Sequence, residues 1–557
     1  MAGNGSALPW LAAYDEGVSH RLQYPEKPVF QLFQEVAEQH QKKTALVFFG
    51  RRITYRELAR YIDALAAALA EMGVKKGDKV ALLLPNCPQY VIAYYAVLQL
   101  GAVVVPVNPL NTERELEYIF RHARVRAAVV LNLLAGRLEK AKERAGAPEK
   151  VIYTSIADFL PFPLNLLYLF KQKMEPAARE AVNKGARFKE LLSRAGVKAP
   201  PPAEVDVFKD LAVLIYTSGT TGVPKGVMLS HYALVVNAHH CISWVDMGQS
   251  RGSDSVLGVL PIFHGFGMSV CMNAALLSGS SVILVPRYNP GELLKIIHRQ
   301  RPTLFSGVPT MYIGLINHPD LRRYDLSSLR GCFVGAAPLP PEVKKKFEEL
   351  TGSRLMEGYG LTEAVTAKCA NPYRGVNKTG SVGVPFPDTV MRIMDVETGE
   401  RELPPGEVGE IVLKSPDLML GYYEMPAETA AAIRDGWLYT GDIGYMDEDG
   451  YFYIVERKKD LIITGGFNVY PREVEDVLYA HPAVKEACVV GVPDDYRGEV
   501  VKAFVVLRDG AACTEEEVIS FCRERLVPYK VPRSVEFRRE LPKSAIGKIL
   551  RRELRGG

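Results

Sequence analysis

The features that would mark a specialised class of protein are missing from this sequence. Its eight cysteines are scattered and include no C-x-x-C pair, so the sequence predicts neither a disulfide framework nor a zinc site, and it favours reduced thiols. The net charge is only +4 and the basic residues are dispersed, which argues against a nucleic-acid-binding protein. No uninterrupted apolar run reaches the ~18 residues expected of a membrane span. The first residues, MAGNGSALPWLAAYDEG, lack the basic and apolar regions of a signal peptide, and together these absences favour a cytoplasmic protein.

Length and composition predict a globular chain with more than one domain. A single hydrophobic core stops growing near ~250–300 residues, and this chain has 557. Hydrophobic residues make up 48% of it and charged residues 24%, which are the proportions of an ordinary folded protein and supply enough apolar material for such cores.

The order of strands and helices predicts the fold class. From residue 45 onward they alternate, which indicates α/β layers with largely parallel sheets. Two helices begin with a capping box, formed by Thr54 with Glu57 and by Thr112 with Glu115. From about residue 380 short strands with Gly and Pro turns indicate a β-rich subdomain, and after Arg457 a compact α+β unit follows. We therefore expect an α/β fold with a large N-terminal domain of layered sheets and helices, a β-rich subdomain and a small α+β C-terminal domain.

The stretch YTSGTTGVPKG, residues 216–226, concentrates groups that bind phosphate. Glycines let backbone N–H groups converge on an anion, hydroxyls add donors, and a lysine adds a mobile positive charge. The order is not that of a Walker A loop, because Gly226 rather than Ser or Thr follows the lysine. Alone, the stretch is as typical of a turn or linker as of a phosphate site. Its candidate binding residues are Thr217, Ser218, Gly219, Thr220, Thr221, Gly222 and Lys225.

Four further stretches carry groups that a nucleotide requires. They are EGYGLTE (357–363), YTGD (439–442), ERKKD (456–460) and PKSAIGKILRR (542–552). Taken singly, each has an ordinary structural explanation, because a Thr–Glu pair often caps a helix, TGD often forms a turn and a lysine-rich terminus often forms a solvated surface. All five stretches in this order form a far more specific pattern.

With these five motifs in register, the sequence resembles the adenylate-forming superfamily of acyl-CoA synthetases, luciferases and peptide-synthetase adenylation domains, from about residue 30 to residue 553. The resemblance is strongest to bacterial long-chain fatty acyl-CoA ligases. It implies an enzyme that uses ATP to convert a carboxylic acid into an acyl adenylate, releases pyrophosphate, and transfers the acyl group to the thiol of CoA. It also implies a domain of residues 1–456 that holds the ATP and acyl sites and a mobile domain of residues 457–557.

The resemblance assigns side chains to ATP and Mg²⁺. It implies that the loop at 216–226 holds the β- and γ-phosphates, that Glu363 helps to hold Mg²⁺, and that Thr362 bonds the α-phosphate. Tyr359 is expected to stack on adenine beside the backbone of 335–337. The remaining residues of the expected ATP site are Asp442 at the ribose, Arg457 at the ribose or a phosphate, and Gly335, Ala336, Ala337 and Gly360.

The C-terminal domain is expected to contribute to both steps of the reaction. By resemblance, Lys548 is a catalytic residue that bridges the carboxylate and the α-phosphate as their oxygens approach. Lys459 matches the hinge about which this domain rotates between the steps. Gly465 and Gly466 match the segment that lines the tunnel for CoA, although a simple turn also explains this glycine pair.

The stretch PIFHGFGMS (261–269) bears on the choice of acid. Amino-acid-activating relatives have an aspartate near this motif to bind the amine, and no acidic residue occurs here, so an amino-acid substrate is disfavoured. His264 and Met268 resemble positions that gate or floor the acyl pocket, while core packing explains Met268 equally well. We expect His264 to be catalytic together with Lys548, Thr362 and Glu363. We expect an unbranched fatty acid of medium to long chain as substrate.

The segment ADFLPFPLNLLYLFKQK (157–173) is unusual within the superfamily and resembles a segment of bacterial long-chain ligases. Its leucines and aromatics are followed by Lys171 and Lys173, as in a segment that rests on a membrane surface. A buried connector between domains is an equal alternative. Peripheral contact with the inner membrane face and a homodimer both stay open.

The substrate and the acceptor also have alternatives. After GYGLTE the chain continues AVTAKCANP, where long-chain ligases have a Ser-Pro-containing stretch, so an aromatic or other carboxylic acid stays open. One rival function is a fatty acyl-AMP ligase that loads a carrier protein, which the lack of a carrier domain after Arg552 disfavours. Another is a non-catalytic nucleotide-binding regulator, which the presence of Lys548, Glu363 and Thr362 disfavours.

Overall fold

The computed structural model describes residues 8–171, 179–180, 182–183, 185–193, 200–217, 224–246, 254–464, 467–494, 496–543 and 549–555. By its contacts the chain forms two compact units. The larger unit consists of Ala13–Val390 and Lys414–Gly436, and the smaller unit consists of Met1–Ala12, Met391–Leu413 and Trp437–Gly557. The expected division into a domain of residues 1–456 and a mobile domain of residues 457–557 stays a prediction.

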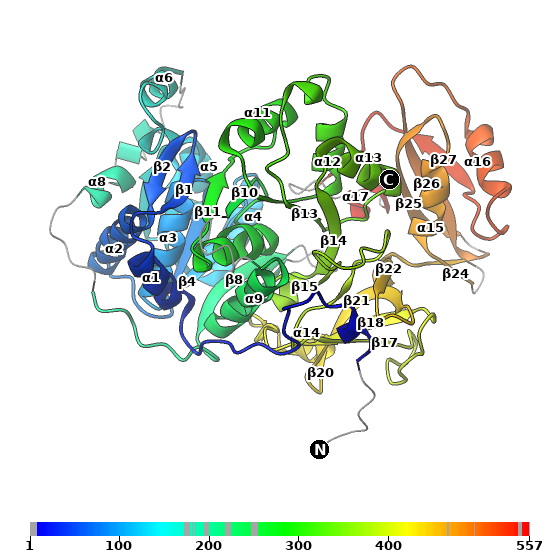
Figure 1. Cartoon of the computed structure of the whole chain (residues 1–557), viewed down its shortest axis with the longest axis horizontal. Coiled ribbons are helices and arrows are strands. Elements are labelled where there is room, and N and C mark those ends of the chain that lie inside the picture. The colour runs from blue at the N-terminus through cyan, green and yellow to red at the C-terminus, as the bar shows by residue number, and fades with distance from the viewer. Residues whose placement is uncertain are drawn as a thin grey trace. The chain divides into compact units, whose positions relative to one another are not determined.

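Two sheets form the frame of the larger unit (Figure 1). The first is nine-stranded, in the order β16 (Val384–Pro385), β15 (Ala367–Ala370), β14 (Arg354–Gly360), β13 (Gly331–Val334), β12 (Leu304–Gly307), β10 (Ser255–Gly258), β11 (Ser281–Leu284), β1 (Thr44–Phe48) and β2 (Arg51–Thr54). The second is eight-stranded, in the order β19 (Gly421–Tyr422), β9 (Lys225–Ser230), β8 (Leu211–Thr217), β4 (Val103–Pro106), β3 (Lys79–Leu83), β5 (Val125–Leu131), β6 (Lys150–Thr154) and β7 (Ala186–Arg187). Most neighbouring strands run parallel, which confirms the predicted α/β class.

The helices of the larger unit differ in how deeply they lie. They are α1 (Val29–Gln39), α2 (Tyr55–Glu71), α3 (Pro88–Gln99), α4 (Glu113–Ala123), α5 (Ala135–Ala145), α6 (Leu164–Lys171), α8 (Phe188–Leu192), α9 (His231–Trp244), α10 (Ala274–Leu277), α11 (Pro290–Gln300), α12 (Pro309–Ile316), α13 (Pro341–Thr351) and α14 (Pro426–Ala432), with β20 (Ile433–Arg434) after the last. All 12 residues of α3 are buried, which explains its nearly uninterrupted apolar sequence. Across the described ranges, no helix has both the length and the apolar character that crossing a bilayer requires.

Local hydrogen bonds set where two of these helices begin. At the start of α2 the Glu57 N–H donates to Thr54 Oγ1 at 3.2 Å, and the Thr54 N–H donates to Glu57 Oε2 at 2.8 Å. Thr112 and Glu115 form the same reciprocal pair at the start of α4. Each box satisfies two N–H groups that the helix itself leaves unbonded, and both predicted boxes are confirmed.

The smaller unit contains an antiparallel β region and an α+β region. In the first, β18 (Gly409–Lys414) pairs with β21 (Trp437–Met446), which pairs with β22 (Phe452–Arg457); β17 (Val390–Met394) precedes them. In the second, β24 (Phe467–Val469), β23 (Ile462–Thr464), β26 (Gly498–Leu507) and β25 (Val484–Asp494) form a sheet, with β27 (Ser534–Phe537) alongside β26. The helices are α15 (Pro471–Tyr479), α16 (Glu515–Arg523) and α17 (Arg552–Arg555). The expected β-rich and α+β regions are confirmed.

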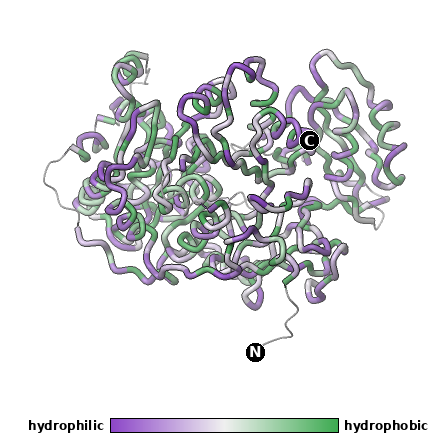
Figure 2. Tube along the Cα trace, viewed as in Figure 1, coloured by the Kyte–Doolittle hydropathy of each residue, from purple (hydrophilic) through white to green (hydrophobic). Residues whose placement is uncertain are grey.

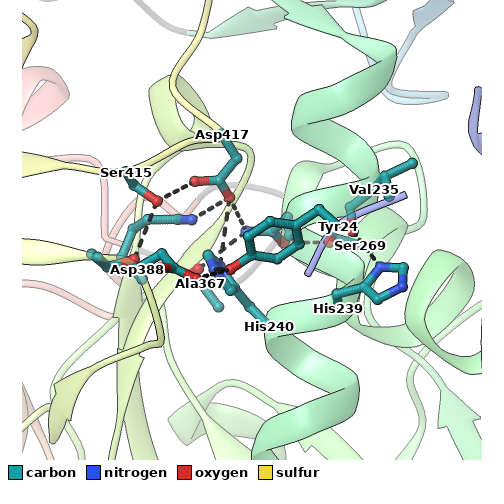
Figure 3. A network of polar contacts seen from close by, with 12 residues as sticks. Tyr24, Val235, His239, His240, Ser269, Ala367, Asp388, Ser415 and Asp417 are labelled. Carbon is teal, nitrogen blue, oxygen red and sulfur yellow. Dashed lines mark hydrogen bonds and ion pairs between the residues drawn. The ribbon is translucent and has the colours of Figure 1, made fainter. Parts of the chain in front are cut away.

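A buried polar network holds several segments of the larger unit together (Figure 3). Lys368 of β15 forms an ion pair with Asp417, and both side chains are wholly buried. Ser415 donates to the other oxygen of the Asp417 carboxylate at 2.5 Å. Asn237 of α9 donates to Asp417 at 2.9 Å and accepts from Ser269 at 2.5 Å. The burial of Asp417 acts to raise its pKa, but the Lys368 ammonium outweighs that effect and lowers it, so the carboxylate is charged.

The network extends to the N-terminal segment through a histidine. The Tyr24 hydroxyl lies 2.8 Å from His240 Nε2 and 2.9 Å from the Asp388 carboxylate. Burial lowers the pKa of His240 to about 3, and the Lys368 ammonium adds to the effect. The imidazole is therefore neutral near pH 7, and the single buried cation of this network is the lysine.

Removing that cation is expected to destabilise the larger unit strongly. Lys368→Met keeps most of the side-chain volume but leaves the Asp417 charge buried without its partner, so we expect the free energy of unfolding to fall by about 3–5 kcal/mol. Lys295→Met is the matched control, because Lys295 pairs with Glu292 on the surface, and it should leave the unfolding midpoint nearly unchanged. Denaturant-induced unfolding followed by circular dichroism measures both. Equal midpoints for the two variants would contradict this assignment.

Candidate functional site

The carboxyl ends of β13 and β14 lie at the centre of the candidate site in the larger unit. The two strands are parallel neighbours in register, so residues 335–337, which follow β13, lie beside 358–360, which end β14. A Cβ on Gly335 would lie only 3.2 Å from the Gly358 carbonyl oxygen, so the two backbones approach closely. The structure thus brings the residues expected around adenine to one edge: Gly335, Ala336, Ala337, Tyr359 and Gly360.

Thr362 and Glu363 lie on a tight turn at the same edge. The turn contains a short 3₁₀ segment, η6 (Thr362–Ala364), and a strained residue, Val365, whose φ is 63°. It returns the chain as β15, antiparallel to β14. A Cβ on Gly360 would lie 1.7 Å from the Thr366 carbonyl oxygen, so only glycine allows so close a return.

The expected phosphate loop begins and ends on a strand pair of the second sheet. Thr217, the last residue of β8, lies opposite Lys225, the first residue of β9. The Lys225 Nζ lies 4.7 Å from the centroid of the Tyr422 ring. The Tyr422 hydroxyl donates to Glu363 Oε1 at 2.9 Å, and the backbone oxygen of Glu363 accepts from the Met419 N–H at 2.8 Å. Lys225 and Glu363 are therefore brought into one neighbourhood by a tyrosine that the sequence analysis did not identify.

The stretch 261–269 packs against the Thr362 turn. A Cβ on Gly265 would lie 2.5 Å from the Val365 carbonyl oxygen, and His264 Nδ1 accepts from the Phe266 N–H at 3.2 Å. Met268 is wholly buried at the start of a π-helix, η4 (Gly267–Asn273). Such π-helices occur often at functional sites, and the sequence analysis did not predict this one. The roles expected for His264 and Met268 stay predictions.

In the smaller unit two of the expected residues face each other across a strand pair. Asp442 of β21 lies opposite Arg457 of β22, and Asp442 Oδ1 lies 2.9 Å from Arg457 Nε. Next to them, the Lys458 ammonium lies 2.8 Å from the carboxylate of Glu410, whose other oxygen accepts from the Gly441 N–H at 3.1 Å. The contact with Arg457 orients the Asp442 carboxylate, and Asp442 is almost fully buried.

An arginine that the sequence analysis did not identify joins the chain end to the expected hinge. The Arg551 guanidinium contacts Glu456 and Glu475, each at 2.6 Å. Burial raises the pKa of Glu456, and the positive charge of Arg551 opposes that shift. Arg555 donates to the backbone oxygen of Lys459 at 2.9 Å. A run of Arg and Lys near a terminus gives no sequence signal that separates these buried contacts from solvated ones.

Part of the expected site lies outside the described residues. This part comprises most of the phosphate loop, the glycine pair and the catalytic lysine: Ser218, Gly219, Thr220, Thr221, Gly222, Gly465, Gly466 and Lys548.

Comparison with protein families gives two matches. The family described as AMP-binding enzyme matches residues 33–423, which is more than half of the chain. The family described as AMP-binding enzyme C-terminal domain matches residues 473–548.

Individual relatives extend the likeness over nearly the whole chain. A long-chain-fatty-acid–CoA ligase of Bacillus subtilis (strain 168) is 48% identical and covers 99% of this chain and 98% of its own. A long-chain-fatty-acid–CoA ligase of Salmonella typhimurium is 39% identical over 98% of this chain and 97% of its own. Among solved structures, an anthranilate CoA ligase in complex with anthranoyl-AMP is similar with a TM-score of 0.83 and 28% identity, covering 96% of this chain and 97% of its own.

Proposed function

The chain belongs to the AMP-binding enzyme family, and we propose that it is an ATP-dependent ligase that joins a medium- to long-chain fatty acid to CoA. The observation that carries this proposal is the edge where β13 and β14 end, at which the turn bearing Thr362 and Glu363 lies beside 335–337. Relatives of nearly full length that are named fatty-acid–CoA ligases support the same conclusion. We place the enzyme in the cytoplasm.

The proposed reaction has two steps. First, a carboxylate oxygen of the fatty acid attacks the α-phosphorus of ATP, the bond from that phosphorus to the bridging oxygen breaks, and pyrophosphate leaves. Second, the CoA sulfur attacks the acyl carbon, its proton goes to solvent, and AMP leaves. The adenylate is required because a carboxylate offers only oxide as a leaving group, whereas AMP leaves readily.

We assign the residues of the larger unit to ATP. Tyr359 stacks on adenine against the backbone of 335–337, and the Thr362 hydroxyl bonds the α-phosphate. Thr217 and Lys225, at the two ends of the loop, bind the β- and γ-phosphates together with the hydroxyls between them. The support is that β14, the turn after it and the β8–β9 pair bring donors and a cation to one neighbourhood.

Glu363 suits Mg²⁺ as a carboxylate ligand. It accepts one hydrogen bond from Tyr422 and forms no ion pair within the described part of the chain. Mg²⁺ binds through one or two carboxylates together with phosphate oxygens, so no larger protein cluster is required. The described residues contain no group of three or more His, Cys, Asp or Glu that could hold a metal unaided. When bound with ATP, Mg²⁺ supplies positive charge against the phosphate oxygens.

We assign the ribose and the second step to the smaller unit. The Asp442 carboxylate accepts from the ribose hydroxyls, with Arg457 beside it at 2.9 Å. Lys459 is the hinge of a mobile domain of residues 457–557, Gly465 and Gly466 line the path of CoA, and Lys548 is the catalytic lysine of the first step. The hydrogen bond from Arg555 to the Lys459 backbone oxygen supports this proposal, because it would fix the hinge in place until the domain rotates.

Lys548→Ala is expected to abolish adenylate formation and to spare the second step. Loss of one charged contact to the reacting oxygens should lower the rate of adenylation by roughly 10²–10³. Transfer from supplied acyl adenylate to CoA should continue, because the lysine acts only while the α-phosphate is attacked. Pyrophosphate release and thioester formation measure the two steps separately. Lys543→Ala is the control, since Lys543 pairs with Glu486 at 2.7 Å, and equal damage to both steps in Lys548→Ala would refute the division.

The preferred acid is expected to be an unbranched fatty acid. His264 and the buried Met268 border the acyl pocket in this proposal, and the stretch 261–269 has no acid to bind an amine. Each methylene that enters an apolar pocket should add about 0.8 kcal/mol of binding, a roughly fourfold gain in kcat/KM. The value should therefore rise steeply from C4 acids and level off where the pocket ends.

Measurement of kcat/KM across C4 to C18 acids, with benzoate and a cinnamate as controls, tests this choice. Better use of the aromatic acids than of every fatty acid would favour the aromatic alternative. Transfer to a carrier protein with none to CoA would instead favour the acyl-AMP ligase alternative.

We also propose that α6 and the residues before it contact a lipid surface at the inner membrane face. Phe162 is 79% exposed and Phe170 is 87% exposed, and the leucines of α6 are exposed as well. Figure 2 shows α6 as a mainly hydrophobic coil. Ala157, Phe159 and Leu160 are buried, so among the described residues of the segment the alternative of a buried connector applies only to its start. A long-chain acid partitions into bilayers, so contact there brings the enzyme to its substrate.

Polar substitutions in α6 are expected to weaken vesicle binding. Leu167→Ser with Phe170→Ser removes two exposed apolar side chains and should lower the bound fraction several-fold, because binding scales with buried apolar area. Leu110→Ser is the matched control, since Leu110 is 71% exposed elsewhere in the larger unit. Co-sedimentation with phosphatidylglycerol vesicles measures binding, and kcat with a soluble short acid should stay unchanged. Equal binding of both variants and the parent chain would exclude α6 as the contact.

A further inference from the structure

Tyr422 is held rigidly at the edge of the second sheet. β19 pairs antiparallel with β9, so the Tyr423 N–H donates to the Gly226 oxygen at 2.7 Å. The Tyr422 N–H donates to Thr429 Oγ1 at 2.8 Å. Tyr422 as a whole is 9% exposed. Bonds on both sides of the residue therefore leave the ring little freedom to move.

The Tyr422 side chain contacts one acidic and one basic group. Its hydroxyl donates to Glu363 Oε1 at 2.9 Å, and its ring centroid lies 4.7 Å from Lys225 Nζ. The two contacts use different parts of the side chain, because the hydroxyl binds the anion and the π-face attracts the cation. Glu363 and Lys225, which are far apart in the sequence, thus both contact the side chain of Tyr422.

The two charges are near each other and yet do not form an ion pair. Both Glu363 and Lys225 interact with Tyr422, but their charged atoms are not joined within 4.0 Å in the described structure. A direct ion pair would cancel the two charges and orient them toward each other. Held apart by the ring, the carboxylate stays available to a cation and the ammonium to an anion.

We propose that Tyr422 is a positioning residue that keeps Glu363 and Lys225 apart and aimed at the metal and the phosphates of Mg²⁺–ATP. This inference rests on the proposed function, which assigns those two ligands to the two charges. The hydroxyl orients Glu363 and prevents it from turning to Lys225. The ring face keeps the Lys225 ammonium near the end of β8, where Lys225 lies opposite Thr217.

Two substitutions in the full-length chain separate these contributions. Tyr422→Phe removes the hydroxyl and keeps the ring, so only the hold on Glu363 is lost. Calorimetric titration should show Mg²⁺–ATP binding weakened about tenfold, the effect of losing a hydrogen bond to a charged group, while metal-free ATP in EDTA binds as before. Tyr422→Leu also removes the ring and should weaken metal-free ATP binding as well. Tyr423→Phe is the matched control, because within the described part of the chain the Tyr423 hydroxyl accepts a hydrogen bond from Arg124, at 3.4 Å, and does not contact Glu363.

Kinetics supply a second readout. In Tyr422→Phe the Mg²⁺ concentration for half-maximal pyrophosphate release should rise by the same factor, and saturating Mg²⁺ should restore most of kcat. Thioester formation from supplied acyl adenylate should be unchanged. A merely structural role would lower both steps and the thermal midpoint, and that result would overturn the proposal.

The remaining outcomes distinguish this inference from the proposed function. If Tyr422→Phe matches the parent chain while Glu363→Gln loses its response to Mg²⁺, Tyr422 has no positioning role and the proposed function stands. If the parent chain neither binds Mg²⁺–ATP nor releases pyrophosphate with any acid, the proposed function fails and this inference fails with it.

Discussion

The buried ion pair between Lys368 and Asp417 is the constraint on which the candidate site depends. Neither charge can remain in the core without the other, so β15 and the segment that leads to β19 must stay together. Two residues beyond Asp417, the Met419 N–H donates to the backbone oxygen of Glu363. The pair therefore joins the turn that carries Glu363 and the strand that carries Tyr422 into one framework.

Close backbone approach then sets the shape of that framework. Gly360 allows β14 to fold back against Thr366, and Gly265 allows the stretch 261–269 to lie against Val365. A side chain at either glycine would collide with a carbonyl oxygen, so neither segment could keep its position. The strained φ of Val365 persists because both neighbours hold it there.

Charged groups serve different purposes in different places. In the smaller unit Arg551 contacts Glu456 of β22 and Glu475 of α15 directly, which ties the segment before α17 to both elements. In the larger unit Glu363 and Lys225 share a tyrosine and are not paired. Groups that neutralise each other stabilise the fold, whereas neighbouring charges that are kept apart can each bind a ligand of opposite sign. This contrast is the physical reason for assigning ligands to Glu363 and Lys225.

Local patterns in the sequence predicted much of this protein. The boxes at Thr54 and Thr112 depend on residues three positions apart, and the alternation of strands and helices reflects which faces are buried, so both follow from short stretches. The five motifs identified the family because their order is specific. The resemblance also implied that Tyr359 lies beside 335–337, and the structure supplies the reason, since β13 and β14 are parallel and bring their carboxyl ends together.

Contacts between distant residues could not be predicted in this way. Nothing near Lys368 indicates that its partner is Asp417, and nothing near Tyr24 indicates His240, because each pairing arises only when separate elements pack. The role of Tyr422 has the same origin. The sequence left a membrane surface and a buried connector equally open for 157–173, and folding buried the first part while exposing Phe170. Residue type and spacing define local structure, but burial and partnership depend on which elements meet in the folded chain.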